Sequence, residues 1–268
     1  MSEVSPIVRD HGGTREGSSE MSILFDEVEA LTAAVLQNVP VGSTIRVSFI
    51  TAAPRVQRRV AGAEASELLI EQARAIRSAE GIPFWHALFI AGELAAEGVP
   101  ADILRSAMFH QDPSQHETVA IVTSEKTPAQ LAELASRTPA HGRDSIALQS
   151  RVTLDDGEDR FLPMLDFTSK AARPGSASTV RAAVEVLETA GILCSSARSF
   201  HFYGHQLVSR DEQLDFWARA LLLTPIVDER WIAHQIRGQV GALRFSANER
   251  GVVPKVIAEI TPSGSVPA

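Results

Sequence analysis

The sequence predicts a mixed α/β protein of the α+β class, because segments with helical spacing and segments with strand alternation follow one another along the chain. Apolar residues recur at helical spacing from Leu24 to Val35, and an extended apolar segment follows at 45–50, after a break at Pro40 and Gly42. Further on, an acidic turn at 155–159 separates two extended segments, which predicts a β-hairpin.

The same patterns predict four regions. Residues 1–20 and 261–268 are rich in small, polar or proline residues without apolar periodicity, so we expect both ends to be disordered. Between them we expect an N-terminal α/β lobe at 21–144 and a second lobe at 145–260. The predicted helices of the first lobe lie near 64–78, 84–97 and 101–109, before a strand at 118–123 and a helix from 127. In the second lobe we expect strands at 146–154, 160–168, 197–203, 225–228, 241–246 and 253–260, with a helix after Gly175 and another after Ser209.

Composition excludes several classes of protein. With 25 Lys and Arg against 33 Asp and Glu, the net charge is −8, so the surface as a whole lacks the basic character of a duplex-binding protein. Any contact with nucleic acid must therefore be local. The single cysteine, Cys194, excludes a disulfide within the chain and a cysteine-rich zinc site. The apolar runs are too short for a membrane span, and the N-terminus lacks the apolar core of a secretory signal, so we expect a cytoplasmic protein.

An acidic residue ends the second strand of the predicted hairpin. Alternate side chains of a strand share a face, so Asp166 and Thr168 point the same way at its end. A carboxylate at this position can bind a metal ion or a polar ligand. It can equally be an ordinary turn or capping residue.

A histidine lies in the next predicted strand, 197–203. Alternation puts Ser199, His201 and Tyr203 on one face, and Phe200 and Phe202 on the other. A histidine beside hydroxyl side chains can hydrogen-bond a phosphate, and the preceding backbone N–H groups can do the same. A partly buried histidine with internal partners explains the pattern as well.

Two further polar positions follow apolar strand-like runs. Asp228 ends the run that begins at Leu221, and Arg244 and Ser246 share the polar face of the strand predicted at 241–246. An arginine fork there suits a triphosphate or a backbone phosphate. A surface arginine on an edge strand would show the same pattern.

Taken in order, these segments resemble the archaeo-eukaryotic primase superfamily. That family has an acidic strand-end motif, a helix, a Ser-x-His strand, a helix and a hydrophobic-Asp motif. Residues 163–168 resemble the first motif, Ser199-Phe200-His201 the second and 226–228 the third, while 243–246 are similar to the run that often follows. The resemblance covers roughly 145–260 and implies a primase-like two-lobed core with a C-terminal RRM-like β-sheet packed by helices. The family usually has a second acid where this chain has Thr168, so the chain looks like the one-aspartate, primase-like branch.

The resemblance also implies roles for these residues. Asp166 and Asp228 would bind Mg²⁺ or Mn²⁺, and with His201 they would form the catalytic site. The positions implied for nucleotide or phosphate binding are Ser196, Arg198, Ser199, His201, Arg244 and Ser246. The implied partners are a nucleoside triphosphate and a single-stranded nucleic-acid template. The implied activity is metal-dependent transfer of a nucleotide from an NTP or dNTP onto a nucleic-acid 3′ hydroxyl.

Two alternatives remain open at the level of sequence. A catalytically inactive primase-like module could bind nucleotide or nucleic acid within a larger assembly, which the missing acid at position 168 favours. More remotely, an unrelated domain of RRM-like topology could stack Phe202 or Tyr203 on single-stranded bases.

Overall fold

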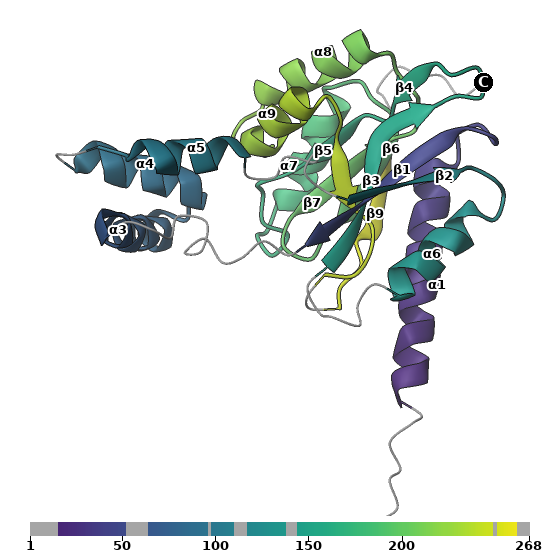
Figure 1. The fold of residues 1–268 in the computed structure, drawn as a ribbon, viewed down its shortest axis with the longest axis horizontal. Helices are drawn as coiled ribbons and strands as arrows, with labels where there is room; N and C mark the ends of the chain where they lie inside the picture. The colour runs from purple at the N-terminus through teal and green to yellow at the C-terminus, as the bar shows by residue number, and fades with distance from the viewer. Residues whose placement is uncertain are drawn as a thin grey trace, which may run out of the picture.

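The computed structural model describes residues 16–51, 64–95, 98–109, 117–137, 144–248 and 251–261. Within these ranges the chain forms eight α-helices and nine β-strands, and the strands make two antiparallel sheets (Figure 1). This architecture confirms the predicted α+β class. None of the helices within these ranges is long and apolar enough to cross a membrane.

The first sheet, sheet A, combines strands from distant parts of the sequence. Its strand order is β2-β1-β3-β4, and β8 also pairs with β3. All of its pairings are antiparallel. The strands are β1 (Thr44–Thr51), β2 (Glu117–Val122), β3 (Asp144–Thr153), β4 (Asp159–Phe161) and β8 (Ala242–Arg244).

The second sheet, sheet B, carries the acidic and histidine motifs. Its order is β5-β7-β6-β9, again antiparallel throughout. The strands are β5 (Met164–Asp166), β6 (Gly191–Ser195), β7 (Phe200–Gly204) and β9 (Lys255–Ile260).

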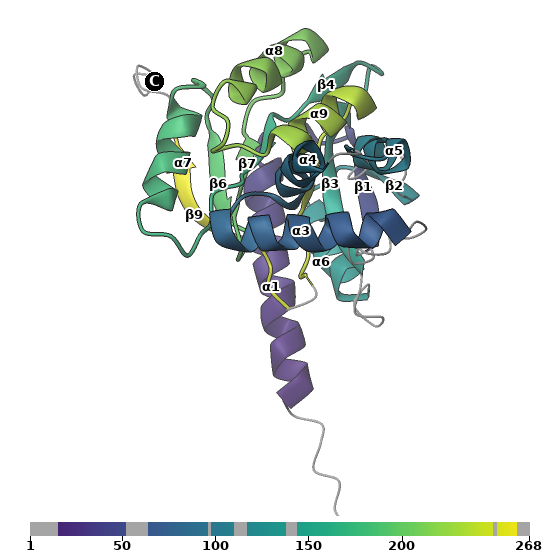
Figure 2. The same cartoon turned by 90° about the vertical axis from the view of Figure 1, so that its left-hand side faces the viewer.

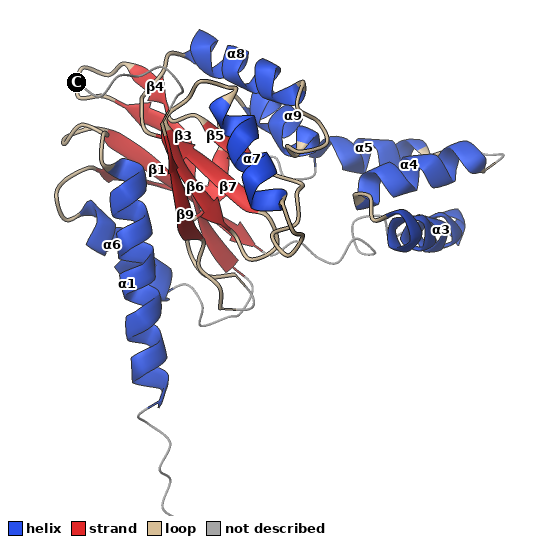
Figure 3. Cartoon of the chain, turned by 180° about the vertical axis from the view of Figure 1, so that it is seen from behind, coloured by secondary structure: helices blue, strands red, loops and turns tan. Residues whose placement is uncertain are grey.

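Five helices pack around the two sheets and form the body of the protein with them. In Figure 3, α1 and α6 lie together on one side of the strands, α7 lies near β7 and β9, and α8 and α9 lie toward β4 and β5. These helices are α1 (Glu16–Leu36), α6 (Thr127–Arg137), α7 (Ser176–Glu185), α8 (Arg210–Leu221) and α9 (Glu229–Gly238). The predicted capping box of α8, formed by Ser209 and Glu212, is present.

The remaining three helices form an arm that stands away from the body. The arm consists of α3 (Glu64–Glu80), α4 (Phe84–Leu94) and α5 (Ala101–Phe109), and Figure 2 shows α3 running across it. The arm has its own small core around Trp85, Leu88 and Ile103, while the body has a separate, larger one. The arm meets the body at α9, where His86 pairs with Glu229 at 2.6 Å and the Arg230 guanidinium lies over the Trp85 ring.

The strand predicted at 160–168 is two strands in different sheets. The chain leaves sheet A after Phe161 and enters sheet B at Met164. Pro163 lies at the junction, and it has no N–H to donate to a ladder. Its carbonyl oxygen accepts a hydrogen bond from Gly204 N–H at 2.7 Å, which joins the switch between the sheets to the end of β7.

The strand predicted at 197–203 is the second half of a hairpin. The first half, β6, was missed because Ile192, Leu193 and Cys194 are all buried and show no alternation. The helix predicted after Gly175 ends at Glu185, so the chain is free to form β6 from Gly191. Residues 196–199 form the turn of the hairpin, with Ala197 at a positive φ of 76°.

Two predicted boundaries also differ from the structure. Helix α1 begins at Glu16, inside the segment expected to be disordered, because a helix can extend beyond its packed residues without apolar periodicity. Residues 1–15 and 262–268 lie outside the described residues. Sheet A runs through the division expected at 144–145, since β3 pairs with β1. Residues 21–144 therefore supply both the arm and half of this sheet.

Tyr203→Phe tests the contact between the two sheets. The fully buried Tyr203 of β7 donates its hydroxyl to the Arg244 carbonyl oxygen of β8 at 3.0 Å. We expect its loss to lower the free energy of unfolding by about 1–2 kcal/mol, measured by urea unfolding. The control Ser136→Ala removes an exposed hydroxyl of α6 and should change stability by less than about 0.5 kcal/mol. Equal unfolding midpoints for Tyr203→Phe and the wild type would contradict this role.

Candidate functional site

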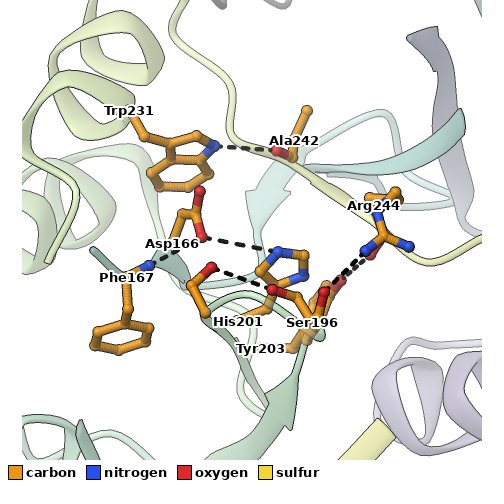
Figure 4. Close-up of polar contacts among 9 residues, drawn as sticks. Asp166, Phe167, Ser196, His201, Tyr203, Trp231, Ala242 and Arg244 are labelled. Atoms are coloured by element: carbon orange, nitrogen blue, oxygen red, sulfur yellow. Dashed lines mark hydrogen bonds and ion pairs between the residues drawn. The ribbon is translucent and has the colours of Figure 1, made fainter. Parts of the chain in front are cut away.

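Asp166 and His201 lie directly opposite each other on neighbouring strands of sheet B (Figure 4). The His201 Nε2 atom is 3.7 Å from the Asp166 Oδ1 atom, and the same oxygen accepts the Phe167 backbone N–H at 2.9 Å. The Asp166 side chain keeps 22% of its exposure, whereas His201 keeps 9%. The carboxylate therefore reaches solvent from a largely buried setting.

Backbone contacts place Asp228 beside Asp166. Its N–H donates to the Asp166 carbonyl oxygen at 2.9 Å, and Val227 bridges to Phe167. The strand predicted at 225–228 is only this single bridge. Asp228 is the N-cap of α9, and its Oδ1 atom accepts the Trp231 backbone N–H at 2.9 Å. The capping and site interpretations of this aspartate are thus compatible, because one oxygen caps the helix while the charge lies near Asp166.

The turn between β6 and β7 adds hydroxyl groups to this edge of sheet B. The Ser196 N–H donates to the Ser199 carbonyl oxygen at 3.0 Å, and the two hydroxyl oxygens lie 3.1 Å apart. Ser196 is buried, Ser199 is half-buried and Arg198 is exposed. Arg198 and Ser199 are therefore the members of this turn that a ligand can reach.

Arg244 approaches the site but binds protein groups. Its guanidinium donates to the carbonyl oxygens of Ser246, of Val252 at 2.8 Å and of Ser196 at 3.3 Å. It therefore ties β8 to the β6–β7 turn, and its positive charge remains near Asp166 and His201. Figure 4 shows Arg244 above Ser196 and Tyr203.

Ser246 lies outside the site, contrary to the phosphate-binding role predicted for it. The residue is 3% exposed, and its hydroxyl oxygen accepts the Ile146 backbone N–H at 2.7 Å. The hydroxyl therefore completes the hydrogen bonding of β3, because buried polar groups need a partner.

Thr168 links the end of β5 to the segment before Asp228. Its hydroxyl donates to the Val227 carbonyl oxygen at 3.2 Å, and its N–H donates to the Ile226 carbonyl oxygen at 3.0 Å. Both bonds hold the segment before Asp228 against the end of β5. Thr168 thus supports the geometry of the two aspartates without adding negative charge.

The environment strongly favours the neutral form of Asp166. Burial, followed by the negative charge of Asp228, raises the pKa of Asp166 to about 8. The Phe167 N–H, Arg244 and Lys170 act in the opposite direction but do not cancel this rise. Burial is also the main cause that raises the pKa of Asp228. Two carboxylates held at this cost to their ionised forms are typical of a site that receives a cation.

His201 is neutral at physiological pH. Burial and the nearby Arg244 charge lower its pKa to about 3. Its Nδ1 atom is buried and makes no hydrogen bond with any residue that the structure describes. The Nε2 atom faces Asp166, so it is the imidazole nitrogen that can donate to or accept from a ligand placed there.

Sequence patterns missed two contributors to this site. Lys170 lies near enough to influence the charge of Asp166, but an exposed lysine in a loop gives no signal in a single sequence. Trp231 anchors α9 by donating its indole N–H to the Ala242 carbonyl oxygen at 3.2 Å. Trp231 could have been predicted from the apolar face of α9, which also includes Ile232.

The acidic pair suits one hard divalent cation. Mg²⁺ commonly binds one or two protein carboxylates and completes its shell with water and substrate phosphates. Within the described ranges, no group of three His, Cys, Asp or Glu side chains is placed to hold a metal. A cation at Asp166 and Asp228 would thus depend on oxygen atoms from a substrate.

Comparison with known proteins identifies one match. The model of a family described as AEP-like, archaeo-eukaryotic primase 1D-like, matches residues 124–257, which is half of the chain. The matched segment contains Asp166, His201 and Asp228. No curated protein and no solved structure matches.

Asp166→Asn tests the electrostatic cost of the buried carboxylate. The Asp166 carboxyl has a pKa of about 8 in the folded protein and 3.8 in the unfolded chain. Between these pH values the folded state therefore keeps a proton on Asp166 that the unfolded chain has released. Wild-type stability contributed by this proton is present below about pH 4 and is lost as the pH rises through about 8. Asparagine imitates the protonated form, so the variant should gain melting temperature over the metal-free wild type progressively across this range. The exposed Asp215→Asn is the control, and a pH-independent difference would contradict the prediction.

His201→Gln should show the opposite pH trend. The unfolded imidazole gains its proton near pH 6.5 and the folded one near 3, so wild-type stability from His201 is present above 6.5 and is lost as the pH falls toward 3. Glutamine does not titrate. The melting temperature of the wild type should therefore exceed that of the variant most at pH 7.5, and the gap should narrow in acid. A gap that widens as the pH falls would rule out a buried neutral His201.

Proposed function

We propose that this chain, which belongs to the archaeo-eukaryotic primase-like family, is a primase-polymerase-type nucleotidyltransferase. It would transfer a nucleotide from an NTP or dNTP onto the 3′ hydroxyl of a nucleic acid. One observation carries the proposal. Two partly buried carboxylates from separate segments, Asp166 and Asp228, lie together beside a neutral histidine. Fold alone would not suffice, because function depends on the site.

In this function Asp166 and Asp228 would hold Mg²⁺ or Mn²⁺. When bound, the cation supplies positive charge that neutralises the triphosphate and favours attack on it. The residues fit this role because each carboxylate uses Oδ1 to accept a backbone N–H, which orients the side chain. Burial and the charge of Asp228, which raise the pKa of Asp166, would both be offset by a bound cation.

The other side of the site would bind phosphate. Ser199 and Arg198 are the accessible residues of the β6–β7 turn, and a hydroxyl and a guanidinium both suit phosphate oxygens. His201 would offer a neutral N–H between this turn and Asp166. Arg244 would act as a positioning residue, because its donors hold the turn through the Ser196 carbonyl oxygen.

The proposed reaction is an in-line displacement at phosphorus. The 3′ hydroxyl oxygen of the nucleic acid bonds to the α-phosphorus, the bond from that phosphorus to the bridging oxygen breaks, and pyrophosphate leaves with the electron pair. The hydroxyl proton is released to solvent. The chain's own contribution would be to position both reactants and to hold charge, as is usual for phosphoryl chemistry.

Asparagine variants test this activity without removing the structural hydrogen bonds. Asp166→Asn retains an oxygen for the Phe167 N–H, and Asp228→Asn retains a helix cap. The wild type should incorporate labelled nucleotides on a single-stranded template with Mg²⁺ or Mn²⁺, and each variant should lose about 100-fold or more of that activity. Product formation on a sequencing gel is the measurement.

Asp215→Asn is the matched control for both variants. It removes one exposed negative charge from α8 and should leave incorporation unchanged. Incorporation that persists at wild-type level in both site variants would overturn the proposed activity.

A non-catalytic nucleotide-binding module is the second candidate. It is favoured by Thr168, whose hydroxyl is committed to the Val227 carbonyl oxygen and leaves the site with two carboxylates. In that case the wild type would bind nucleotides without incorporating them, and binding would survive in both asparagine variants. Isothermal titration of an NTP with and without Mg²⁺ distinguishes this outcome from an enzyme.

A further inference from the structure

Positive side chains gather between the site and the arm. The Ala171 N–H donates to the Arg198 carbonyl oxygen at 3.1 Å, which places the loop after β5 against the β6–β7 turn. The Arg173 N–H donates to the Lys170 carbonyl oxygen at 3.0 Å, so the same loop turns back on itself. Lys170, Arg173 and Arg198 are thereby brought to one region of the body.

The arm adds a fourth cation to this region. A Cβ atom built on Gly81, just after α3, would lie 3.4 Å from the Arg173 Nη2 atom. The Gly81 N–H donates to the Arg77 carbonyl oxygen at 3.0 Å, so Arg77 lies one helical turn away. We call Arg77, Lys170, Arg173 and Arg198 the basic cluster. Its members come from the arm, from the loop after β5 and from the β6–β7 turn.

No carboxylate within the described part of the chain forms an ion pair with the basic cluster. All four residues are exposed, and none of their side chains forms a hydrogen bond or ion pair with a residue that the structure describes. Partial burial, and then Arg198, Arg77 and Arg173, lower the pKa of Lys170. The negative charge of Asp166 opposes this shift. The four cations thus repel one another beside the acidic pair.

Some exposed arginines outside the cluster are paired, although Arg74, Arg105 and Arg210 are exposed without an ion pair to any described residue. Several form ion pairs with a carboxylate on the same helix, namely Arg137–Glu133, Arg181–Glu185 and Arg219–Asp215. A chain with net charge −8 has ample carboxylates for such pairing. A group of four unpaired cations is therefore suited to an anion that the protein itself does not provide.

The placement of the cluster indicates an extended anion. Lys170 lies near Asp166. Arg173 lies beside Gly81 at the end of α3 and Arg77 belongs to α3 itself, so the cluster extends from the acidic pair toward the arm. Guanidinium forks suit phosphate oxygens, and exposed cations along a surface suit successive backbone phosphates. We propose that the basic cluster binds the phosphate backbone of a single-stranded nucleic acid, with Arg77 of the arm and Arg173 of the body on the same strand. This inference rests on the proposed function for the strand's role as template, but it concerns binding alone.

The test compares two double variants that remove the same charge. Arg77→Gln/Arg173→Gln removes two members of the cluster, and Arg105→Gln/Arg210→Gln removes two exposed arginines from α5 and α8. Fluorescence anisotropy with a labelled single-stranded oligonucleotide of about 20 nucleotides, in the absence of NTP, gives the affinity at several salt concentrations. The cluster variant should bind at least about 10-fold more weakly at low salt, and its log–log salt slope should fall by about 1.4, or about 0.7 for each lost contact.

The control variant should bind the oligonucleotide within about two-fold of the wild type, because its arginines lie outside the cluster. Thermal melting checks that both variants fold. Recovery of most of the affinity in Arg77→Lys/Arg173→Lys would support phosphate contacts over a loss of packing. Equal losses in the two glutamine variants would overturn the proposal, because net charge alone would then explain them.

A second titration separates the strand from the nucleotide. A fluorescent NTP with Mg²⁺ should bind the wild type and Arg77→Gln/Arg173→Gln equally. Weaker NTP binding with unchanged oligonucleotide binding would overturn the proposal and assign the cluster to the triphosphate. Because neither titration requires nucleotide transfer, a wild type that binds the strand through the cluster but incorporates nothing would refute the proposed enzyme and leave the strand site standing.

Discussion

The hydrogen bond from the Asp228 N–H to the Asp166 carbonyl oxygen is only 2.9 Å long, and it joins the cap of α9 to the end of β5. The remaining geometry of the site follows from this contact. Pairing of β5 with β7 sets His201 opposite Asp166, and the bonds made by Thr168 hold the chain before Asp228 in place. If this backbone contact were broken, the end of β5 and the cap of α9 would no longer be joined directly at the two aspartates.

The site is electrostatically costly for the folded protein. A largely buried carboxylate near a second one resists ionisation, and a buried imidazole resists protonation. Arg244 stands near both, and its positive charge lowers the cost of ionising Asp166 while its guanidinium also donates to backbone carbonyl oxygens. Such unfavourable arrangements persist where function requires them, and well-packed surroundings such as Trp217 against Trp231 maintain them.

The arm and the acidic pair share one helix. Asp228 caps α9, and the next two residues hold the arm, through the Glu229–His86 ion pair and through Arg230, which contacts Trp85 and donates to the Ala107 carbonyl oxygen at 2.6 Å. On its other side the arm brings Arg77 toward the basic cluster. The arm is therefore joined to the body at the two residues that follow Asp228 and again beside Arg173 of the basic cluster. Although the arm has its own core, these two contacts connect it to the segments that carry the two proposed binding sites.

Local sequence patterns were sufficient to predict the elements with strong periodicity and the order of the motifs. Helices such as α3, α5 and α8 were predicted within a few residues, because apolar spacing and capping residues are local properties. Asp166, His201 and Asp228 were singled out from local patterns together with the family resemblance. The hairpin of β6 and β7 was only half predicted, because a strand buried on both faces shows no alternation.

Tertiary structure alone decided which of these residues meet. The switch between sheets at Pro163, the use of Asp228 as a helix cap and the burial of Ser246 depend on partners far away in the sequence. The basic cluster is the clearest case, since Arg77 and Arg173 show no common pattern until the arm docks on the body. Local spacing specifies helices and strands, but contacts between distant segments depend on packing and on backbone hydrogen bonds that a single sequence does not reveal.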